Sequence, residues 1–267
     1  SGGAHTADSF GIGTCGGNGG SVTINGGTII AEASSSAISS GRGGSITING
    51  GVVRTEAFAM SEGNCTTVES VGIGTCQMGY GGSVTINGGT VTLLNPSGRD
   101  ADGIDSNGNI NINGGLVYIS LVGDGSNCAL DYGSENGGVC HINGGTVVAC
   151  GGSTMLEAMS ETSAQPSLLY AGTTQAAGTE VALQAADGKT LLTFAAPNSF
   201  SAVLVSCPEM QLGSTYTLTL GAASQEITLT QVADSYGVSG GPGPDHSHGL
   251  PQKGLTPPID SNFLSLL

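Results

Sequence analysis

The sequence predicts an all-β protein, in which a parallel β-helix (solenoid) is followed by a small antiparallel β region and an extended C-terminal arm. Three observations support this fold class. A phrase built on Thr-Ile-Asn-Gly-Gly recurs along the first 150 residues, an apolar anchor precedes each copy, and no repeat shows a helical period. Repeats of about 20 to 50 residues are typical of stacked units that bury their apolar faces only against neighbours.

The repeated phrase contains two short β runs separated by Asn-Gly-Gly. Its copies are GGSVTINGGTI from Gly19, GGSITINGGVV from Gly43, GGSVTINGGTV from Gly81, NGNININGGLV from Asn107 and GGVCHINGGTV from Gly137. Their asparagines are 24, 38, 26 and 30 residues apart: Asn25, Asn49, Asn87, Asn113 and Asn143. We expect these asparagines to form a ladder at one corner, tying side-chain amides to backbone groups of neighbouring coils. The glycines are expected to turn the corners, where positive φ is needed.

Alternation within the strands predicts the inward side chains. The anchors form one predicted column: Ile12, Ile38, Ile73, Ile104 and Leu130. The next strand supplies two more: Val22, Ile46, Val84, Ile110 and Cys140, then Ile24, Ile48, Ile86, Ile112 and Ile142. At about 1.5–3 kcal/mol per buried side chain, one column contributes on the order of 10 kcal/mol, so a Gly-rich chain can fold. On the outer face, a polar column is expected from Thr23, Thr47, Thr85 and Asn111.

Composition divides the chain into four segments. They are the coils (1–150), a connector (151–166), the antiparallel region (167–238) and a Pro- and Gly-rich arm (239–267). In the antiparallel region, alternation predicts strands at 191–194, 202–205, 216–220 and 226–232. The arm ends in the apolar residues Phe263, Leu264, Leu266 and Leu267.

The charge balance excludes several partners. Five Lys and Arg against twenty Asp and Glu give a net charge of -15, a field that repels nucleic acid and anionic membranes. No apolar run approaches the 18 residues of a membrane span. Abundant Gly, Ser, Thr and Asn with little Lys and Glu predict a secreted or cell-surface protein, whose signal peptide we expect to be absent from this sequence.

Seven cysteines are present, and none forms a Cys-x-x-Cys pair, which argues against a zinc ribbon or a thioredoxin-type site. Cys15 and Cys76 occupy the same place in two copies of GIGTC. The spacing of adjacent coils, about 4.8 Å, suits a disulfide, but these two residues lie two coils apart, so the pairing stays open. Cys140 stands at an inward position and is expected to be a small core residue.

Acidic turn residues predict a calcium site. Asp100, Asp102, Asp105 and Asn107 lie within eight residues, and Asp124 and Asp131 follow one coil later. Calcium takes several oxygen ligands on a turn, and stacked aspartates repel unless a cation or a proton lies between them. The alternative is that these are solvated turn residues, which Asp and Asn favour.

Carboxylates on a β-helix also raise the possibility of a polysaccharide lyase. Such a lyase needs a basic residue beside the calcium, and Arg99 is the only one near the aspartates, where an ion pair is the simpler role. For non-catalytic sugar binding, Tyr118 and Tyr132 are candidate stacking platforms, with packing at coil edges as the alternative. The polar Thr column offers a flat alternative surface.

The phrases ADGIDSNGNININGG (101–115), NCALDYGSENGG (127–138) and CHINGGTVVA (140–149) resemble a family of secreted bacterial β-helix carbohydrate-binding domains. The segment 187–218 resembles the C-terminal part of the same family. The resemblance implies a right-handed parallel β-helix, calcium bound by turn aspartates, and non-catalytic attachment to acidic or plant-type polysaccharide. Asp102, Asp105 and Asp131 match the motif aspartates. Cys128 stands where the family usually has Gly.

The first functional hypothesis is therefore an extracellular, non-catalytic carbohydrate-binding or adhesive protein stabilised by calcium. A structural subunit of a self-assembling filament is the alternative, because the apolar arm offers a segment to pair with a neighbour's exposed sheet edge. The lyase is a third hypothesis.

Overall fold

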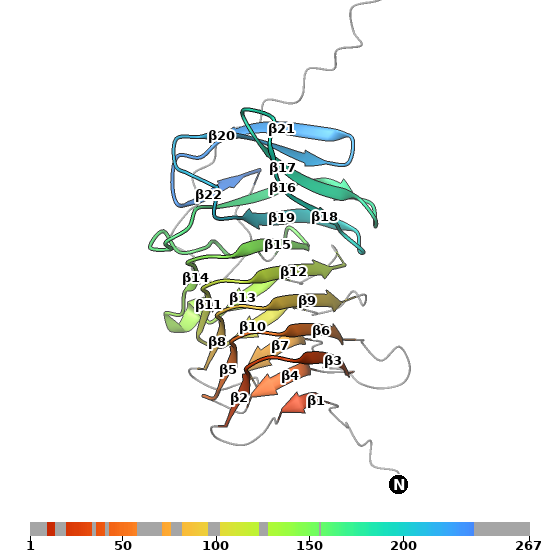
Figure 1. Ribbon diagram of the computed structural model, residues 1–267, viewed down its shortest axis with the longest axis vertical. Helices are drawn as coiled ribbons and strands as arrows, with labels where there is room; N and C mark the ends of the chain where they lie inside the picture. Colours follow the sequence, from red (N-terminus) through yellow and green to blue (C-terminus); the bar gives the residue numbers. More distant parts are fainter. Residues whose placement is uncertain are drawn as a thin grey trace, which may run out of the picture.

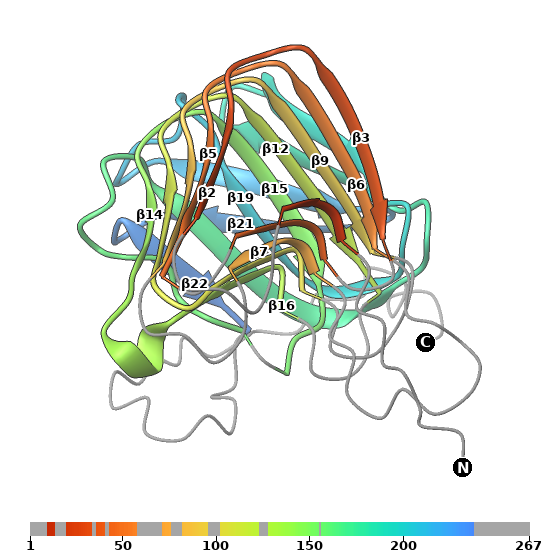
Figure 2. The same ribbon diagram turned by 90° about the horizontal axis from the view of Figure 1, so that it is seen from below.

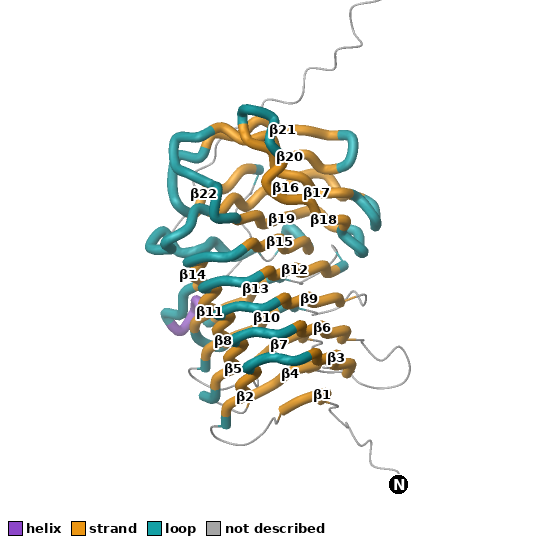
Figure 3. Tube along the Cα trace, in the orientation of Figure 1, coloured by secondary structure: helices purple, strands orange, loops and turns teal. Residues whose placement is uncertain are grey.

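The computed structural model describes residues 10–13, 20–33, 36–40, 43–57, 71–75, 82–95, 102–122, 128–154 and 156–237. Nearly all regular structure in these ranges is β, and the predicted parallel β-helix is confirmed (Figures 1 and 3). Each coil contributes one strand to each of three sheets, and the sheets enclose a common interior (Figure 2).

The strands of a coil follow the sequence phrase in order. Sheet 1 carries the anchors: β1 (Phe10–Gly13), β4 (Ser36–Ser40), β7 (Val71–Thr75), β10 (Ile104–Ser106) and β13 (Leu130–Tyr132). Sheet 2 precedes Asn-Gly-Gly: β2 (Ser21–Ile24), β5 (Ser45–Ile48), β8 (Ser83–Ile86), β11 (Asn109–Ile112) and β14 (Cys140–Ile142). Sheet 3 follows it: β3 (Thr28–Ala33), β6 (Val52–Ala57), β9 (Thr90–Asn95), β12 (Leu116–Leu121) and β15 (Thr146–Gly151).

Parallel, in-register pairing confirms the three predicted inward columns. Ile46 pairs with Val22 on one side and Val84 on the other, and all three point into the core. Ile46 and Val84 are fully buried, whereas Val22, in the first coil, is only partly buried. Sheet 3 adds columns of its own, among them Ile29, Val53, Val91, Val117 and Val147.

The five asparagines form a ladder along one corner. Asn49 Nδ2 donates to Asn25 Oδ1 at 2.8 Å, and the same bond joins Asn87 to Asn49 (2.8 Å), Asn113 to Asn87 (2.9 Å) and Asn143 to Asn113 (2.9 Å). Backbone groups were the expected partners, but between the coils the amides bind one another, and a backbone N–H is the partner at the last asparagine, Asn143. Identical side chains held in register lie one coil spacing apart, so amide pairs with amide.

The two glycines after each asparagine allow the coils to approach closely. Gly89 has φ +87°, and a Cβ placed there would lie 2.6 Å from the carbonyl oxygen of Gly51 in the coil below. Thr90 donates its backbone N–H to that same oxygen at 2.8 Å. The corner therefore needs glycine twice over, for the left-handed backbone and for the contact between coils.

Sheet 3 does not end with the last coil. It continues through β19 (Phe200–Ser206), β16 (Ser167–Gln175) and β22 (Ala233–Tyr236). β19 is antiparallel to both β15 and β16, and β22 is parallel to β16. The predicted boundaries at 151 and 167 thus fall within one eight-stranded sheet, and β15 itself extends to Gly151.

The remaining strands form sheet 4, which is antiparallel and packs on the outer face of sheet 3. Its order is β18 (Thr190–Ala195), β17 (Glu180–Ala185), β20 (Thr215–Leu220) and β21 (Ala223–Thr228). A second core lies between the two sheets and includes Val148 and Val205 from sheet 3 and Leu218 from sheet 4. The strand predicted at 226–232 begins earlier, at residue 223, because Gly221 (φ +61°) turns the chain directly after β20.

The predicted connector closes the last coil of sheet 2. The Ser160 N–H donates to Cys140 O at 2.8 Å, and the Gln165 N–H donates to Ile142 O at 3.0 Å. The Ala164 N–H donates to Asn143 Oδ1 at 3.1 Å and so ends the asparagine ladder. The edge of β14 is therefore covered by the chain that follows it.

Four of the seven cysteines are described, and all four are buried and free: Cys128, Cys140, Cys150 and Cys207. Burial raises the thiol pKa of each, to about 11 for Cys207. The core position predicted for Cys140 is confirmed. Cys15, Cys65 and Cys76 lie outside the described residues, so the predicted disulfide finds no support in the described part. Residues 58–70 and the arm with Phe263, Leu264, Leu266 and Leu267 also lie outside it.

Replacing Gly89 with Ala tests the close approach of the coils. Gly27 is the matched control, because it has the same φ of +87° and nothing within 4 Å of its added Cβ. Both substitutions lower the free energy of unfolding by about 1–2 kcal/mol, because alanine disfavours the left-handed backbone. Only Gly89→Ala also forces the coils apart, so urea unfolding is expected to show a loss at least about 1 kcal/mol larger than for Gly27→Ala. Equal losses would contradict the packing of this corner.

Candidate functional site

The structure places the predicted calcium ligands on and beside sheet 1. Asp105 and Asp131 are in-register partners on β10 and β13. Asp102 is buried, and its Oδ1 accepts the backbone N–H of Cys128 at 2.6 Å. This aspartate thus joins two successive coils of the chain.

The described aspartates do not by themselves form a metal site. Among the described residues, no three His, Cys, Asp or Glu side chains lie close enough together to hold a metal ion. A calcium ion needs several oxygen ligands, more than Asp105, Asn107 and Asp131 supply. The other predicted ligands, Asp100 and Asp124, lie outside the described residues. Calcium at this position stays a prediction.

Sequence reasoning missed Glu157, which closes the edge of β13. Its Oε2 accepts the Tyr132 backbone N–H at 2.8 Å, and its Oε1 accepts the Ser134 hydroxyl, in the short helix η1 (Ser134–Asn136), at 2.6 Å. Burial raises the pKa of this carboxyl to about 7, against the opposing effect of these two hydrogen bonds, and the nearby Asp131 and Glu135 raise it further. No local motif marks a carboxylate whose partners lie more than twenty residues away.

The two tyrosines predicted to stack on sugars make contacts within the protein. The Tyr132 hydroxyl donates to Ala158 O at 2.7 Å, and its ring packs against the core of the β-helix. The Tyr118 ring stacks on Phe194 of sheet 4, with centroids 5.1 Å apart and planes 8° from parallel. Both rings therefore have the packing role that the sequence left open as the alternative.

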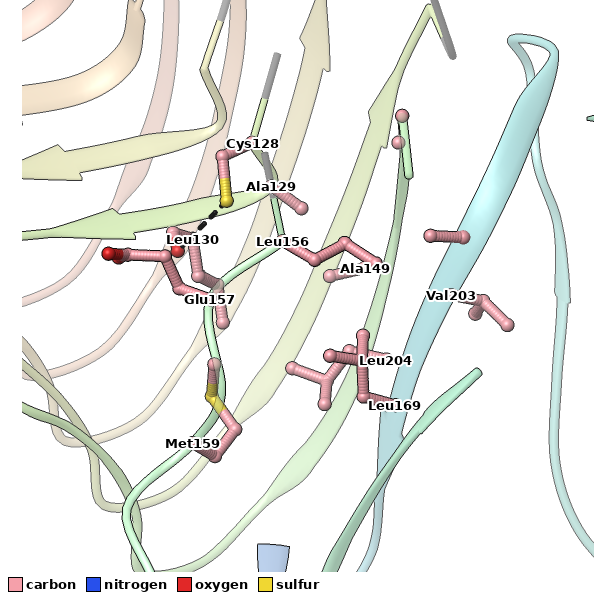
Figure 4. A pocket seen from close by; sticks show the side chains of 13 residues that line it. Cys128, Ala129, Leu130, Ala149, Leu156, Glu157, Met159, Leu169, Val203 and Leu204 are labelled. Atoms are coloured by element: carbon pink, nitrogen blue, oxygen red, sulfur yellow. Dashed lines mark hydrogen bonds between the residues drawn. The ribbon is translucent and has the colours of Figure 1, made fainter. Parts of the chain in front are cut away.

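A small cavity lies where the connector crosses the end of the β-helix (Figure 4). It holds about 20 Å³ of free space, room for about one water molecule. Leu156, Leu169 and Leu204 form much of its lining, and the Glu157 carboxylate points away from them (Figure 4). Its size and apolar lining suit a packing defect better than a substrate site.

The outer face of sheet 2 is an ordered polar surface. We call it the hydroxyl–amide face; it consists of Ser21, Ser45, Ser83, Asn109, Thr23, Thr47, Thr85, Asn111 and the five ladder asparagines. Its columns run through the coils in register, as in Thr23, Thr47 and Thr85. Ser45 donates its hydroxyl to Ser21 at 3.1 Å, and four amide hydrogen bonds hold the asparagines. The Thr and Asn111 column continues on β14 as His141, whose ring nitrogen Nε2 forms a 2.9 Å hydrogen bond with Thr162 Oγ1. Apart from His141, no described residue on this face is ionisable, although the chain carries a net charge of -15.

No family model matches the chain, and no curated protein or solved structure matches it. The described part of the chain contains no helix with the length and apolarity needed to cross a membrane.

Glu157 gives the stability of the fold a distinctive pH dependence. Its pKa is raised when folded, so between about pH 4.5 and 7 the folded state binds more protons than the unfolded state, and stability falls as the pH rises. The expected loss between pH 5 and 8 is on the order of 1–3 kcal/mol. Urea unfolding of Glu157→Gln should show no such slope, because glutamine does not titrate in this range. The protein should still fold, because the amide oxygen can accept the Tyr132 N–H. The control Glu135→Gln, which removes an exposed carboxylate at the same end, should retain it. A wild-type stability that rises over this range contradicts the burial of a titrating Glu157.

Proposed function

We propose that this protein is an extracellular, non-catalytic carbohydrate-binding protein and that its hydroxyl–amide face binds a neutral polysaccharide. The observation that carries the proposal is an ordered, uncharged array of hydroxyls and amides on a strongly acidic protein.

The chemistry of this face matches that of a polysaccharide. Each amide has two N–H donors and an oxygen with two lone pairs. An inner member of the ladder such as Asn87 uses one donor toward Asn49 and one lone pair toward Asn113. It keeps one donor and one lone pair for a ligand. Ser and Thr hydroxyls likewise donate and accept, as sugar hydroxyls do.

The array is also fixed before a ligand arrives. Parallel strands repeat at about 4.8 Å, and alternate residues along a strand lie about 6.6 Å apart. Hydrogen bonds between coils hold Ser21, Ser45 and the five ladder asparagines in place. Fewer rotamers are lost on binding, which favours affinity for an extended, repetitive polymer.

Charge favours a neutral ligand over an acidic one. A polyanion approaching a protein of net charge -15 is repelled unless a cation lies between them. Among the described residues of the outer face of sheet 2, His141 is the one ionisable side chain, and no carboxylate stands beside it on the face, which supports binding without catalysis. An acidic polysaccharide would need calcium at the aspartates of sheet 1.

Affinity electrophoresis in gels containing xyloglucan, galactomannan or polygalacturonate, with and without EDTA, tests this proposal. We expect retardation by a neutral polymer that EDTA leaves unchanged. Thr47→Glu with Thr85→Glu places two carboxylates on the face and should weaken binding at least about tenfold, or 1.4 kcal/mol. Thr219→Glu, at an outward position of β20, is the matched control and should bind as the wild type does.

Two results would count against the proposal. Binding to none of the polymers removes the carbohydrate function. Binding only to polygalacturonate, and only without EDTA, would show that the binding site is the calcium-dependent aspartates of sheet 1 and not the hydroxyl–amide face.

A further inference from the structure

Each ladder asparagine is followed by a glycine, and this dipeptide can react with itself. A glycine has no Cβ, so its backbone nitrogen is open to attack the side-chain amide of the asparagine before it. In the described chain, such pairs occur at the five ladder asparagines and at Asn107 and Asn136. In a folded protein, the reaction needs an asparagine side chain that can turn and a glycine that solvent can reach.

The ladder does not hold its five members equally. Asn25, in the first coil, accepts Asn49 Nδ2 at 2.8 Å, and its own amide nitrogen has no partner in the part of the chain that the structure describes. The other four each make two hydrogen bonds. Asn87, for example, donates to Asn49 at 2.8 Å and accepts from Asn113 at 2.9 Å. Asn25 therefore has to break one hydrogen bond to turn, where Asn87 has to break two.

The glycine after Asn25 is also the most accessible of its kind in the ladder. Gly26 is exposed, and a Cβ placed on it would meet no described atom within 4 Å. Gly88 is half-buried, and a Cβ placed there would lie 3.1 Å from the carbonyl oxygen of Asn49 in the coil below. A cyclic intermediate and a water molecule thus have room at Gly26 that the stacked coils deny to Gly88.

The two pairs outside the ladder engage the attacking nitrogen. The Gly108 N–H, after Asn107, donates to Ser106 Oγ at 3.3 Å. The Gly137 N–H, after Asn136, donates to Ser134 O at 3.1 Å. These hydrogen bonds hold the nitrogen away from the asparagine side chain, so we expect both pairs to react more slowly than Asn25.

We propose that Asn25 is a site of spontaneous deamidation in the folded protein. The Gly26 backbone nitrogen attacks Cγ of Asn25 and forms a cyclic imide, and its proton leaves with the side-chain amide as ammonia. Water then opens one of the two carbonyl–nitrogen bonds of the imide, which gives aspartate or isoaspartate. Water is the one co-reactant, and nothing is oxidised or reduced. The proposal does not depend on the polysaccharide function.

The ladder accepts an aspartate at position 25 and at no inner position. A carboxylate at position 25 still accepts Asn49 Nδ2, and the donor that it loses has no described partner. A carboxylate at position 87 would lose the bond to Asn49 and set two acceptor oxygens against each other. Deamidation of Asn25 therefore adds a negative charge at one end of the hydroxyl–amide face without breaking the ladder.

The chain contains its own matched control for this reaction. Residues 19–28 and 81–90 have the same sequence, GGSVTINGGT, so Asn25 and Asn87 have the same local chemistry. The full chain would be incubated at mildly alkaline pH, with and without urea, and both sites followed by peptide mapping with mass spectrometry. We expect Asn25 to react at least about fivefold faster than Asn87 in the folded protein, because it breaks one hydrogen bond fewer. In urea the two rates should be equal.

Gly26→Ala tests the attacking group. Gly26 does not have a positive φ and has space for a methyl group, so this variant should fold as the wild type does. The methyl group hinders the attack, so the reaction at Asn25 should slow while that at Asn87 stays unchanged. An unaltered rate at Asn25 would contradict the proposed chemistry.

The remaining outcomes also decide the proposal. Equal rates in the folded protein, or no reaction at Asn25, would overturn it, because the first coil would then hold this amide as firmly as the inner coils do. A difference that persists in urea would overturn it as well, since the fold would not be its cause. Urea unfolding of Asn25→Asp should match the wild type, whereas Asn87→Asp should raise the unfolding equilibrium constant at least about fivefold. Equal losses would contradict the unequal ladder.

Discussion

Exact stacking of the Asn-Gly-Gly corners is the constraint on which the rest of the structure depends. At each corner, an asparagine binds its equivalent in the next coil, and a left-handed glycine such as Gly89 brings the backbones together. A shift of one residue would turn every inward isoleucine of sheet 2 toward solvent. The same register sets the outward Ser, Thr and Asn columns, so the core and the hydroxyl–amide face have one origin.

A stack of parallel strands leaves open edges at its end, and the chain closes all three edges of the last coil in different ways. Glu157 accepts the Tyr132 N–H at β13, the connector binds β14, and β19 pairs with β15. The pairing of β19 with β15 also extends sheet 3 beyond the β-helix, and sheet 4 packs on this extension to form a two-layer sandwich. That sandwich covers the outer face of β15 and β19, and no described strand covers the outer face of β3, β6 and β9.

The repeat was predictable from sequence because its information is local and recurs. Ile38 and Ile73 follow from the anchors, and Asn49 and Asn87 from the phrase itself. Contacts between unlike segments were not predictable: Phe194 reaches Tyr118 across sheets, and Glu157 reaches Tyr132 from the connector. The sequence suggested that two tyrosines bind sugars, but both rings pack within the protein. It also suggested a separate C-terminal region, but sheet 3 continues from the β-helix into that region.

Paired cysteines on adjacent coils test this register most directly. Thr47 and Thr85 are Cα partners on β5 and β8, and neighbouring strands about 4.8 Å apart suit a disulfide. Mass spectrometry of the oxidised Thr47→Cys, Thr85→Cys protein should find the two new cysteines joined, and Thr47→Cys with Ser83→Cys, two residues out of register, should give little or none of this bond. Preferential joining of the second pair would contradict the parallel, in-register coil.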